Sequence, residues 1–201
     1  MTVVDAIRSR RSIRRYTDQP VPGEVIERVL AAAVWAPSAH NRQPWRFAIL
    51  NAPEAQARLA RAMGDRLRAD RLADGDDSEA VVRDAQRSYT RLTGAPVVIV
   101  VCLTMADMDS YPDTRRKKAE YTMAVQSVAM AVQNLLLAAH VEGLGACWMC
   151  APLFCPEAVR EALNLPHDWE AQAVITLGSP AGAGTLRAAS RRSLAEVAIF
   201  R

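Results

Sequence analysis

The sequence predicts an α+β fold in which helices surround a central mixed β-sheet. Three observations support this class. Half of the 201 residues are hydrophobic and 23% are charged, which are the proportions of a globular protein with a real core. Short β-branched runs alternate with longer segments of helical periodicity. No repeat, linker or low-complexity tract divides the chain, so we expect a single domain over residues 1–201.

Two helices and a strand open the chain. Residues 3–9 read as a short helix, and Pro-Gly-Glu at 22–24 begins a second helix that runs to about residue 35. Apolar residues recur at helical spacing in this second helix, and Pro37 ends it. Residues 45–50 then alternate between apolar and polar, which predicts a strand.

The next stretch, residues 53–92, is rich in Arg, Ala and Asp and is predicted to be helical, with a weak break at residues 74–78. A charged helical stretch of this kind is either a solvated excursion or a lid over a substrate. The solvated excursion is the simpler interpretation, because charged helix faces usually meet water.

Two apolar segments are expected to form the core. Residues 96–103 (PVVIVVCL) are a continuous β-branched run, typical of a strand buried on both faces. Residues 115–140 predict one long helix, apolar on nearly all sides between 123 and 139, although Gln126 and Gln133 argue against a membrane span. A helix that is apolar all round needs cover all round, and we expect another subunit to cover one side.

The last third of the chain supplies two further strands, at 146–149 and 171–177, with a short helix at 156–163 between them. Residues 194–200 form an apolar tail. Such a tail could leave the domain and pair with a partner subunit.

Composition excludes several functions. The net charge of +3 is too small to indicate a nucleic-acid partner. The N-terminus lacks the apolar run of a secretory signal, so we expect a cytoplasmic protein with reduced cysteines. Cys147 and Cys150 form a C-x-x-C pattern, but Cys102 and Cys155 do not make a matching second pair. Buried or site-lining thiols are therefore preferred over a metal site or a redox dithiol.

Two basic clusters are candidates for binding a phosphate. Arg10, Arg11, Ser12 and Arg14 place forked donors and a hydroxyl within five residues, which matches the oxygens of a phosphate. A solvated basic turn explains this cluster equally well. Arg191 and its neighbour Arg192 form a second, weaker cluster near the C-terminus, for which a solvated tail is the simpler interpretation.

An amide-rich loop at residues 36–45 connects the second helix to the first strand. Asn41 and Gln43 can match the donor and acceptor edge of a uracil-like ring, such as the pyrimidine edge of a flavin. Pro37 and Pro44 stiffen the loop, which lowers the ordering entropy that recognition would cost. An ordinary helix–strand connection is the alternative, but such loops rarely contain this much amide.

A third segment, residues 142–152, follows the long helix. Its glycines end that helix, and the short strand after them finishes in small residues that leave backbone N–H groups accessible. This is not a G-x-G-x-x-G fingerprint, because the glycines follow a helix. No nucleophile–base pair, P-loop or catalytic side chain stands out in the sequence, so the chemistry must come largely from a bound cofactor.

Taken in order, these segments resemble the nitroreductase family of FMN flavoproteins over essentially the whole chain. The family pattern R-R-S-x-R-x-[YF] is present at residues 10–16, and A-P-S-x-x-N-x-Q-P-W is present at residues 36–45. The resemblance implies an intertwined homodimer with two interfacial FMN molecules. It also implies ping-pong hydride transfer through FMN N5, from NAD(P)H to nitroaromatic, quinone or enone acceptors.

The resemblance also assigns site residues. It implies that the phosphate and ribityl chain contact Arg10, Arg11, Ser12, Arg14 and Arg191. It implies that the ring meets the partner's loop at 37–39, the side chains of Asn41 and Gln43, and backbone donors near N5 and O4. The ring contacts named in this way are Pro37, Ser38, Ala39, Asn41, Gln43, Cys150 and Ala151.

The chain departs from the family pattern at two positions. Several members carry Glu-Gly where this chain has Cys150-Ala151, and a Lys where it has Ala189. These departures bear on the contacts near N5 and on the phosphate clamp. Trp45, Trp148 and the charged segment 66–87 are candidates to shape the substrate pocket.

A narrower resemblance connects the chain to the nitroreductase-like C-terminal domain of the F-420 γ-glutamyl ligase. It rests on residues 111–116, 142–148, 153–155 and 165–170, together with the long helix. It implies an alternative function as a stand-alone reductase of a dehydro precursor of F-420, with reduced deazaflavin as a candidate donor. A non-catalytic module that binds flavin or F-420 is a further alternative. The flavin-fragmenting enzyme of benzimidazole synthesis is disfavoured, because it usually carries Asp where this chain has Ser12.

Overall fold

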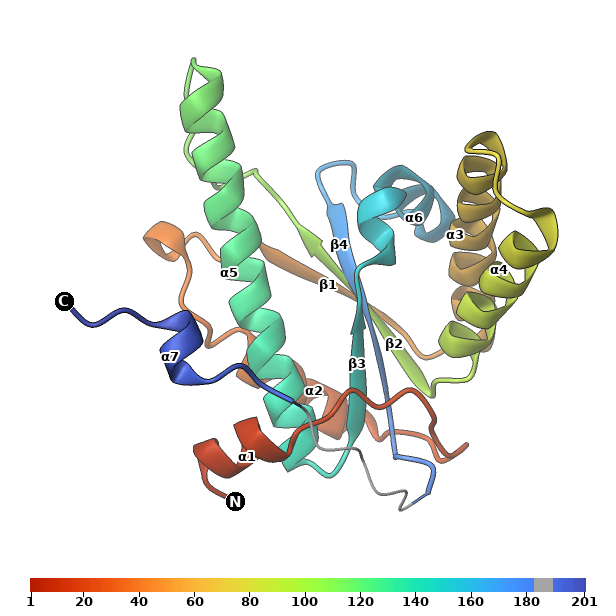
Figure 1. Ribbon diagram of the computed structural model, residues 1–201, viewed down its shortest axis with the longest axis horizontal. Coiled ribbons are helices and arrows are strands. Elements are labelled where there is room, and N and C mark those ends of the chain that lie inside the picture. The colour runs from red at the N-terminus through yellow and green to blue at the C-terminus, as the bar shows by residue number, and fades with distance from the viewer. Residues whose placement is uncertain (183–189) are drawn as a thin grey trace.

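The computed structural model describes residues 1–182 and 190–201 and has one four-stranded sheet (Figure 1). Its strands are β1 (Trp45–Leu50), β2 (Val97–Leu103), β3 (Gly145–Met149) and β4 (Glu170–Gly178), in the order β1-β2-β4-β3. All three pairings are antiparallel. The α+β class is confirmed, but the expected mixed sheet is wrong for these strands. The connections set strand direction, and hydrophobic periodicity does not encode them.

A parallel contact does occur outside the four strands, as an isolated bridge between Ser12 and Ala146. It fixes the N-terminal segment alongside β3. Tyr16 makes a second, antiparallel bridge with Pro180 just beyond β4. The segment between α1 and α2 is therefore attached to the sheet at two points, one on the edge strand β3 and one just beyond the end of β4.

Strand β2 is buried along its whole length, as the sequence predicted. Its odd-numbered residues, such as Ile99, pack into a core with α2 (Gly23–Ala33) and α5 (Thr114–Val141). Its even-numbered residues, such as Val100, pack on the opposite face with α3 (Pro53–Ala73) and α6 (Pro156–Leu163). The strand alternation thus divides the side chains between two layers of helices.

Helix α5 crosses the sheet as the main helix of the first core (Figure 1). The Asp113 side chain accepts a hydrogen bond from Arg116 N–H at its start, and Gly143, with φ of +79°, reverses the chain after its end. By length and hydropathy alone α5 could cross a membrane. Val128, Val132 and other apolar residues of its inner face are instead buried against the sheet.

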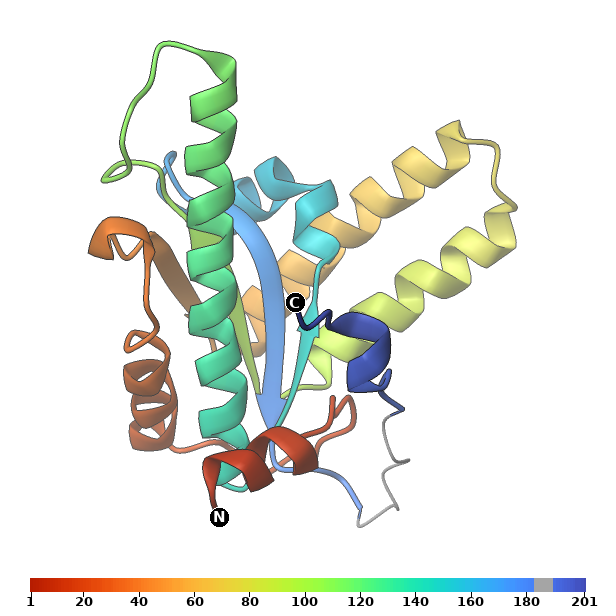
Figure 2. The same ribbon diagram turned by 60° about the vertical axis from the view of Figure 1, so that its left-hand side comes forward.

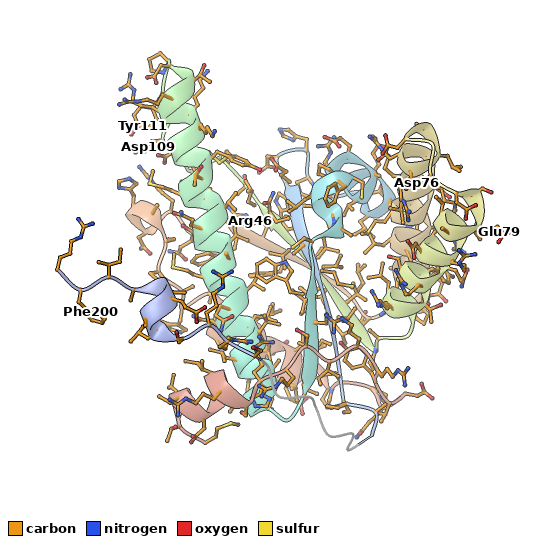
Figure 3. The ribbon with its side chains drawn as sticks, in the orientation of Figure 1. Arg46, Asp76, Glu79, Asp109, Tyr111 and Phe200 are labelled. Carbon is orange, nitrogen blue, oxygen red and sulfur yellow. The ribbon has the colours of Figure 1, made fainter. Side chains whose placement is uncertain are left out.

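Helices α3 and α4 (Ser78–Thr93) form a hairpin that projects from the sheet (Figure 2). The break between them confirms the interruption expected near residues 74–78. Arg71 ties the turn together, with Nε donating to Asp76 and Nη1 donating to Asp84. Figure 3 shows Asp76 and Glu79 at the outer end of this hairpin. The outer half of the hairpin therefore matches the solvated excursion that the sequence favoured.

The remaining helices are short: α1 (Val3–Ser9), η1 (Ala39–Asn41), η2 (Ala151–Phe154) and α7 (Leu194–Val197). The apolar side chains of the C-terminal segment are exposed, and Phe200 at 84% exposure points away from the rest of the chain (Figure 3). Trp35, just after α2, is 86% exposed. These side chains have little protein around them within one chain.

Ile99 and Ile49 offer a matched test of the central strand, because they pair across β1 and β2. Ile99 is fully buried, whereas Ile49 is 37% exposed. We expect Ile99→Ala to lower the free energy of unfolding by about 2–4 kcal/mol, because it leaves a cavity between two layers. Ile49→Ala should cost about half as much or less. Urea denaturation checks both, and equal losses would contradict the assignment of β2 as the buried centre.

Candidate functional site

The basic segment at residues 10–16 is held against the end of the sheet by hydrogen bonds. Ile13 N–H donates to Ala146 O at 3.0 Å. The Tyr16 hydroxyl donates to Ile13 O at 2.5 Å and lies 2.7 Å from Thr176 Oγ1. Burial raises the pKa of Tyr16 to about 12, partly opposed by the Thr176 hydrogen bond. Tyr16 is therefore a neutral donor at physiological pH and holds the segment in place.

A close contact allows this segment to lie against β3. A Cβ atom on Gly145 would come within 2.7 Å of the Ile13 side chain. Only glycine leaves room for the Ile13 side chain at that distance. The position of the neighbouring arginines thus depends on residue 145 being glycine, which has no side chain.

These contacts form the rim of a cavity of about 550 Å³. Arg10, Arg11, Ser12 and Arg14 all line it, as does Arg15. Among the described residues, no carboxylate contributes to the lining. Guanidinium groups without a counter-charge attract an anion, and the volume is that of a small-molecule site. The first basic cluster of the sequence is therefore a concave cationic surface.

The half-buried side chain of Arg11 has an unused donor. Its Nη1 donates to the backbone oxygens of Arg8 and Arg10, at 2.6 and 2.8 Å. Its Nε is buried and has no hydrogen-bond partner among the described residues. Buried donors are rarely left unpaired in folded proteins, so this atom fits a site whose ligand supplies the acceptor.

Sequence reasoning missed His140 and Ser9, which also line this cavity. The Ser9 hydroxyl donates to Asp5 O at 2.7 Å and lies 2.6 Å from His140 Nε2. His140 belongs to the last turn of α5. Only the packing of α1 against the end of α5 brings the two together, and no local motif signals that contact.

The amide-rich loop has an unusual backbone. His40, Asn41 and Gln43 all have positive φ, at 51°, 54° and 50°. Left-handed conformations of residues other than glycine cost of order 1–3 kcal/mol each and collect at functional sites, although Asn tolerates them better. This loop therefore stores strain that the surrounding contacts must hold.

Three polar contacts supply that support. Gln43 N–H donates to Ser38 Oγ at 3.0 Å, and Ala39 N–H donates to Ser127 Oγ on α5 at 3.2 Å. Arg42 forms an ion pair with Asp109 at 2.7 Å. The Ser38 hydroxyl thus supports the loop from within.

The basic cavity and the amide-rich loop lie far apart in one chain. The loop contacts α5 at Ser127, whereas the cavity contacts it at Leu136 and His140. At 1.5 Å per residue, these two cavity contacts lie about 14 and 20 Å from Ser127 along the helix axis. Figure 1 shows η1 beside the middle of α5 and α1 at its C-terminal end. One chain therefore does not bring the two groups of candidate residues together.

Cys150 and Ala151 directly follow the last residue of β3. Ala146 lines the basic cavity at one end of β3, and Cys150 follows the other end, about 13 Å away at the usual rise of a strand. In the described part of the chain, the N–H groups of Cys150 and Ala151 have no hydrogen-bond partner. Trp148 Nε1 donates to the exposed Cys150 Sγ at 3.0 Å. Two free backbone donors thus lie within reach of an elongated ligand held in the cavity.

Two other candidates lie elsewhere. Arg191 is exposed, donates to its neighbour Ser190 O at 2.8 Å, and is absent from the lining of the basic cavity. Ala189 lies outside the described residues. Trp45 is buried in the α2–α5 core, so it packs the fold within this chain.

The cysteines are free thiols in the described structure. Burial raises the pKa of Cys102 to about 12, and it also raises the pKa of Cys147 and Cys155. Neutral buried thiols are poor nucleophiles and poor metal ligands. Among the described residues, no group of three or more His, Cys, Asp or Glu side chains could hold a metal ion.

Comparisons with known proteins identify the family. A model of the nitroreductase family matches residues 7–179. A protein of Methanothermobacter thermautotrophicus, provisionally named an NADH dehydrogenase/NAD(P)H nitroreductase, is 33% identical over 183 residues, which cover 90% of this chain and 78% of that protein. The 5,6-dimethylbenzimidazole synthase of Rhodobacter capsulatus is 31% identical over 179 residues, covering 89% and 83%.

Solved structures give the same picture. The crystal structure of a provisionally named nitroreductase from Desulfovibrio desulfuricans, in complex with FMN, has 32% identity and a TM-score of 0.74, covering 100% of this chain and 97% of that one. A BluB-like flavoprotein from Clostridium difficile has a TM-score of 0.81 over 100% and 99% of the chains. At 22% identity, this second likeness shows the fold alone.

Tyr16→Phe tests the attachment of the basic segment. We expect a loss of about 1–3 kcal/mol in the free energy of unfolding, because the Ile13 carbonyl and Thr176 hydroxyl lose a buried partner. Because the folded pKa of Tyr16 is raised above its ordinary value of 10, its contribution is present below about pH 10 and is lost as the pH rises toward 12. Tyr16→Phe should therefore weaken the alkaline fall in stability. Tyr89→Phe is the control, and an equal effect there would contradict the assignment.

Glycine substitutions test the strain in the amide-rich loop. We expect His40→Gly to raise the free energy of unfolding by about 0.5–1 kcal/mol, because glycine adopts positive φ without the Cβ clash. Asn41→Gly should gain less, since asparagine tolerates this conformation. Urea denaturation measures both. A loss of stability in His40→Gly would show that the loop is not strained at that residue.

Proposed function

Because the chain belongs to the nitroreductase family, we propose that it is an FMN-dependent oxidoreductase. Its electron donor in this proposal is NAD(P)H, and its acceptors are nitroaromatics, quinones or enones. The single observation that carries the proposal is the arginine cavity at one end of β3, whose described lining has no carboxylate, with backbone donors beyond the other end that have no partner among the described residues. The cavity suits a phosphate, and the free donors suit the polar edge of a ring.

The cavity residues have the chemistry to hold FMN by its phosphate. Arg10, Arg11 and Arg14 would supply charged donors, Arg11 Nε among them, and Ser12 would supply a hydroxyl to the phosphate or ribityl chain. Arg191 would join them from the C-terminal segment. Bound FMN would supply a two-electron carrier that accepts and releases hydride at N5.

Near N5 this chain would use its backbone. The N–H groups of Cys150 and Ala151 are free to donate, so they can orient the ring without a catalytic side chain. The Glu-Gly of several family members is replaced here by Cys150-Ala151, so no carboxylate stands at this position. In this proposal the side chains position the donor and the acceptor, and solvent supplies protons.

The remaining ring contacts would come from a second copy of the chain. In one chain the loop carrying Pro37, Ser38, Ala39, Asn41 and Gln43 contacts α5 about 14–20 Å along the helix axis from the cavity lining. In a homodimer the partner's copy of this loop would approach the ligand from the other side. Exposed apolar side chains such as Trp35 and Phe200 would be covered in such a dimer.

Two alternatives differ in the reaction. One is the reduction of a dehydro precursor of F-420, or simple binding of flavin and F-420, which the segment at 111–116 favours through its resemblance to the ligase domain. The other is benzimidazole synthesis, which the 31% identical relative from Rhodobacter capsulatus raises. Ser12 disfavours the second, because that enzyme usually carries Asp there.

Cofactor binding is tested with FMN and riboflavin on the purified protein. We expect yellow protein with absorbance near roughly 450 nm and bleaching on addition of NADH or NADPH. Arg11→Ala should weaken FMN binding by about 2–3 kcal/mol, because it removes a charge-assisted bond to the phosphate. It should leave riboflavin binding unchanged, since riboflavin has no phosphate.

Arg8→Ala is the matched control, because Arg8 is exposed and outside the cavity lining. Colourless protein that takes up no FMN would refute the proposal. Bleaching by reduced F-420 but by neither nicotinamide would support the F-420 alternative. A yellow protein that no donor bleaches would indicate a binding module.

A further inference from the structure

We infer that His140 is a further contact to the cofactor phosphate, and that it makes this contact only when its ring carries a second proton, so that FMN binding takes up a proton from solvent. The inference rests on the proposed flavin function and concerns the regulation of that same site. His140 is half-buried and lines the arginine cavity from the last turn of α5. It is the one histidine among the described lining residues.

Ser9 fixes a proton on one nitrogen of the His140 ring. The Ser9 hydroxyl has a single proton, which it donates to Asp5 O at 2.7 Å. Its contact with His140 Nε2, at 2.6 Å, therefore requires Nε2–H as the donor and the hydroxyl oxygen as the acceptor. In the neutral ring, the other nitrogen, Nδ1, is then an acceptor. Among the described residues Nδ1 has no hydrogen-bond partner, so it is the ring atom left for a ligand.

A phosphate group does not bind to an acceptor nitrogen. Phosphate oxygens accept hydrogen bonds, and the lone pair of a neutral Nδ1 would repel them. A proton on Nδ1 converts this atom into a charge-assisted donor. Histidine is the side chain that changes charge between about pH 5 and 8, so such a proton is available near neutral pH. Phosphate binding and protonation of the ring are therefore linked, and each favours the other.

The charges lining the cavity leave the ring without a counter-ion. The cationic groups of the lining all come from the segment after α1, and they are Arg10, Arg11, Arg14 and Arg15. Residues 180–182, which also line the cavity, are uncharged. A bound phosphate dianion supplies a counter-charge, and the C-terminal end of a helix also favours a cation.

The carboxylates nearest in the chain to Ser9 and His140 are bonded to other groups. Asp5 of α1 accepts from Thr2 N–H at 3.0 Å. Glu142, just after α5, forms an ion pair with Arg28 of α2 at 2.8 Å. Neither residue belongs to the described lining of the cavity. The ligand is therefore the anion that can pair with a protonated His140.

Calorimetry in several buffers measures the proton directly. We would titrate the full chain with FMN at about pH 7.5 in MOPS, HEPES and Tris, whose ionisation enthalpies differ, because a phosphate monoester is then already mostly dianionic. We expect the uptake of about half a proton or more per FMN. Riboflavin should take up none, since it has no phosphate. Absence of proton uptake with FMN would overturn the inference.

Substitutions of His140 separate its charge from its position. His140→Gln is expected to weaken FMN binding about three- to tenfold at about pH 6.5 and to remove the proton uptake. The unmodified protein should lose about three- to tenfold in affinity between about pH 6.5 and 8.5. His140→Arg has a permanent charge, so its affinity should change by less than about twofold over that range. His167→Gln is the matched control, because His167 is exposed and outside the cavity lining.

Ser9→Ala tests how the proton on Nε2 is fixed. Without the hydroxyl, the neutral ring can carry its one proton on Nδ1 and donate it to the phosphate. We expect the proton uptake per FMN to fall by about half or more, and the loss of affinity at higher pH to become smaller. Unchanged proton uptake would overturn the tautomer on which the inference depends.

The outcomes distinguish this inference from the proposed function. If the unmodified protein binds no flavin, the proposed function fails and the inference falls with it. If FMN binds with equal proton uptake in His140→Gln and His167→Gln, the inference alone is wrong. Should His140→Gln fail to fold, the buffer dependence of the unmodified protein and of Ser9→Ala still decides the question.

Discussion

The seven residues of β2 lie out of contact with water, so the chain has to cover two faces of one strand at once. This requirement places α2 and α5 on one side of the sheet and α3 and α6 on the other. It also puts β4 and then β3 beside β2 on one flank. Because β3 is the edge strand there, its open side can accept the basic segment. The cationic cavity is thus a product of how the core is covered.

Helix α5 then decides which candidate residues can meet. It gives the amide-rich loop an anchor at Ser127 and gives the basic cavity a wall at His140. A rigid helix keeps these points apart whatever the loops do. The separation explains why the basic cavity and the amide-rich loop are two separate features in a single chain. It also gives a geometric reason for a second copy in the proposed function.

Much of the fold could be predicted from the sequence, because burial follows periodicity. The run at 96–103 indicated a doubly covered strand, and the helix at 156–163 has the bounds that were predicted. Strand direction could not be predicted, since it depends on how distant connections cross the sheet. Local patterns specify elements, and they say little about the order in which those elements pack.

The candidate site, too, could be predicted from the sequence only in part. Arg10, Arg11 and Arg14 could be found as a cluster in sequence and do share a cavity. Ser9 and His140 could not, because they are 131 positions apart and meet only through packing. The positive φ angle at Gln43 was also hidden, since glutamine does not signal that conformation. A second cavity, between the α3–α4 hairpin and η2, could not be predicted either, because it depends on how the hairpin is oriented against η2, which no local spacing encodes.

The distance between Ser127 and His140 has a consequence for how such a protein behaves in solution. In the proposed dimer, the ligand bridges two chains that each hold only part of it. Mass action then makes subunit association and cofactor retention a single equilibrium, so each stabilises the other. Dilution would release flavin in proportion to the loss of dimer. The cellular concentrations of the protein and of free flavin would together set the fraction that is active.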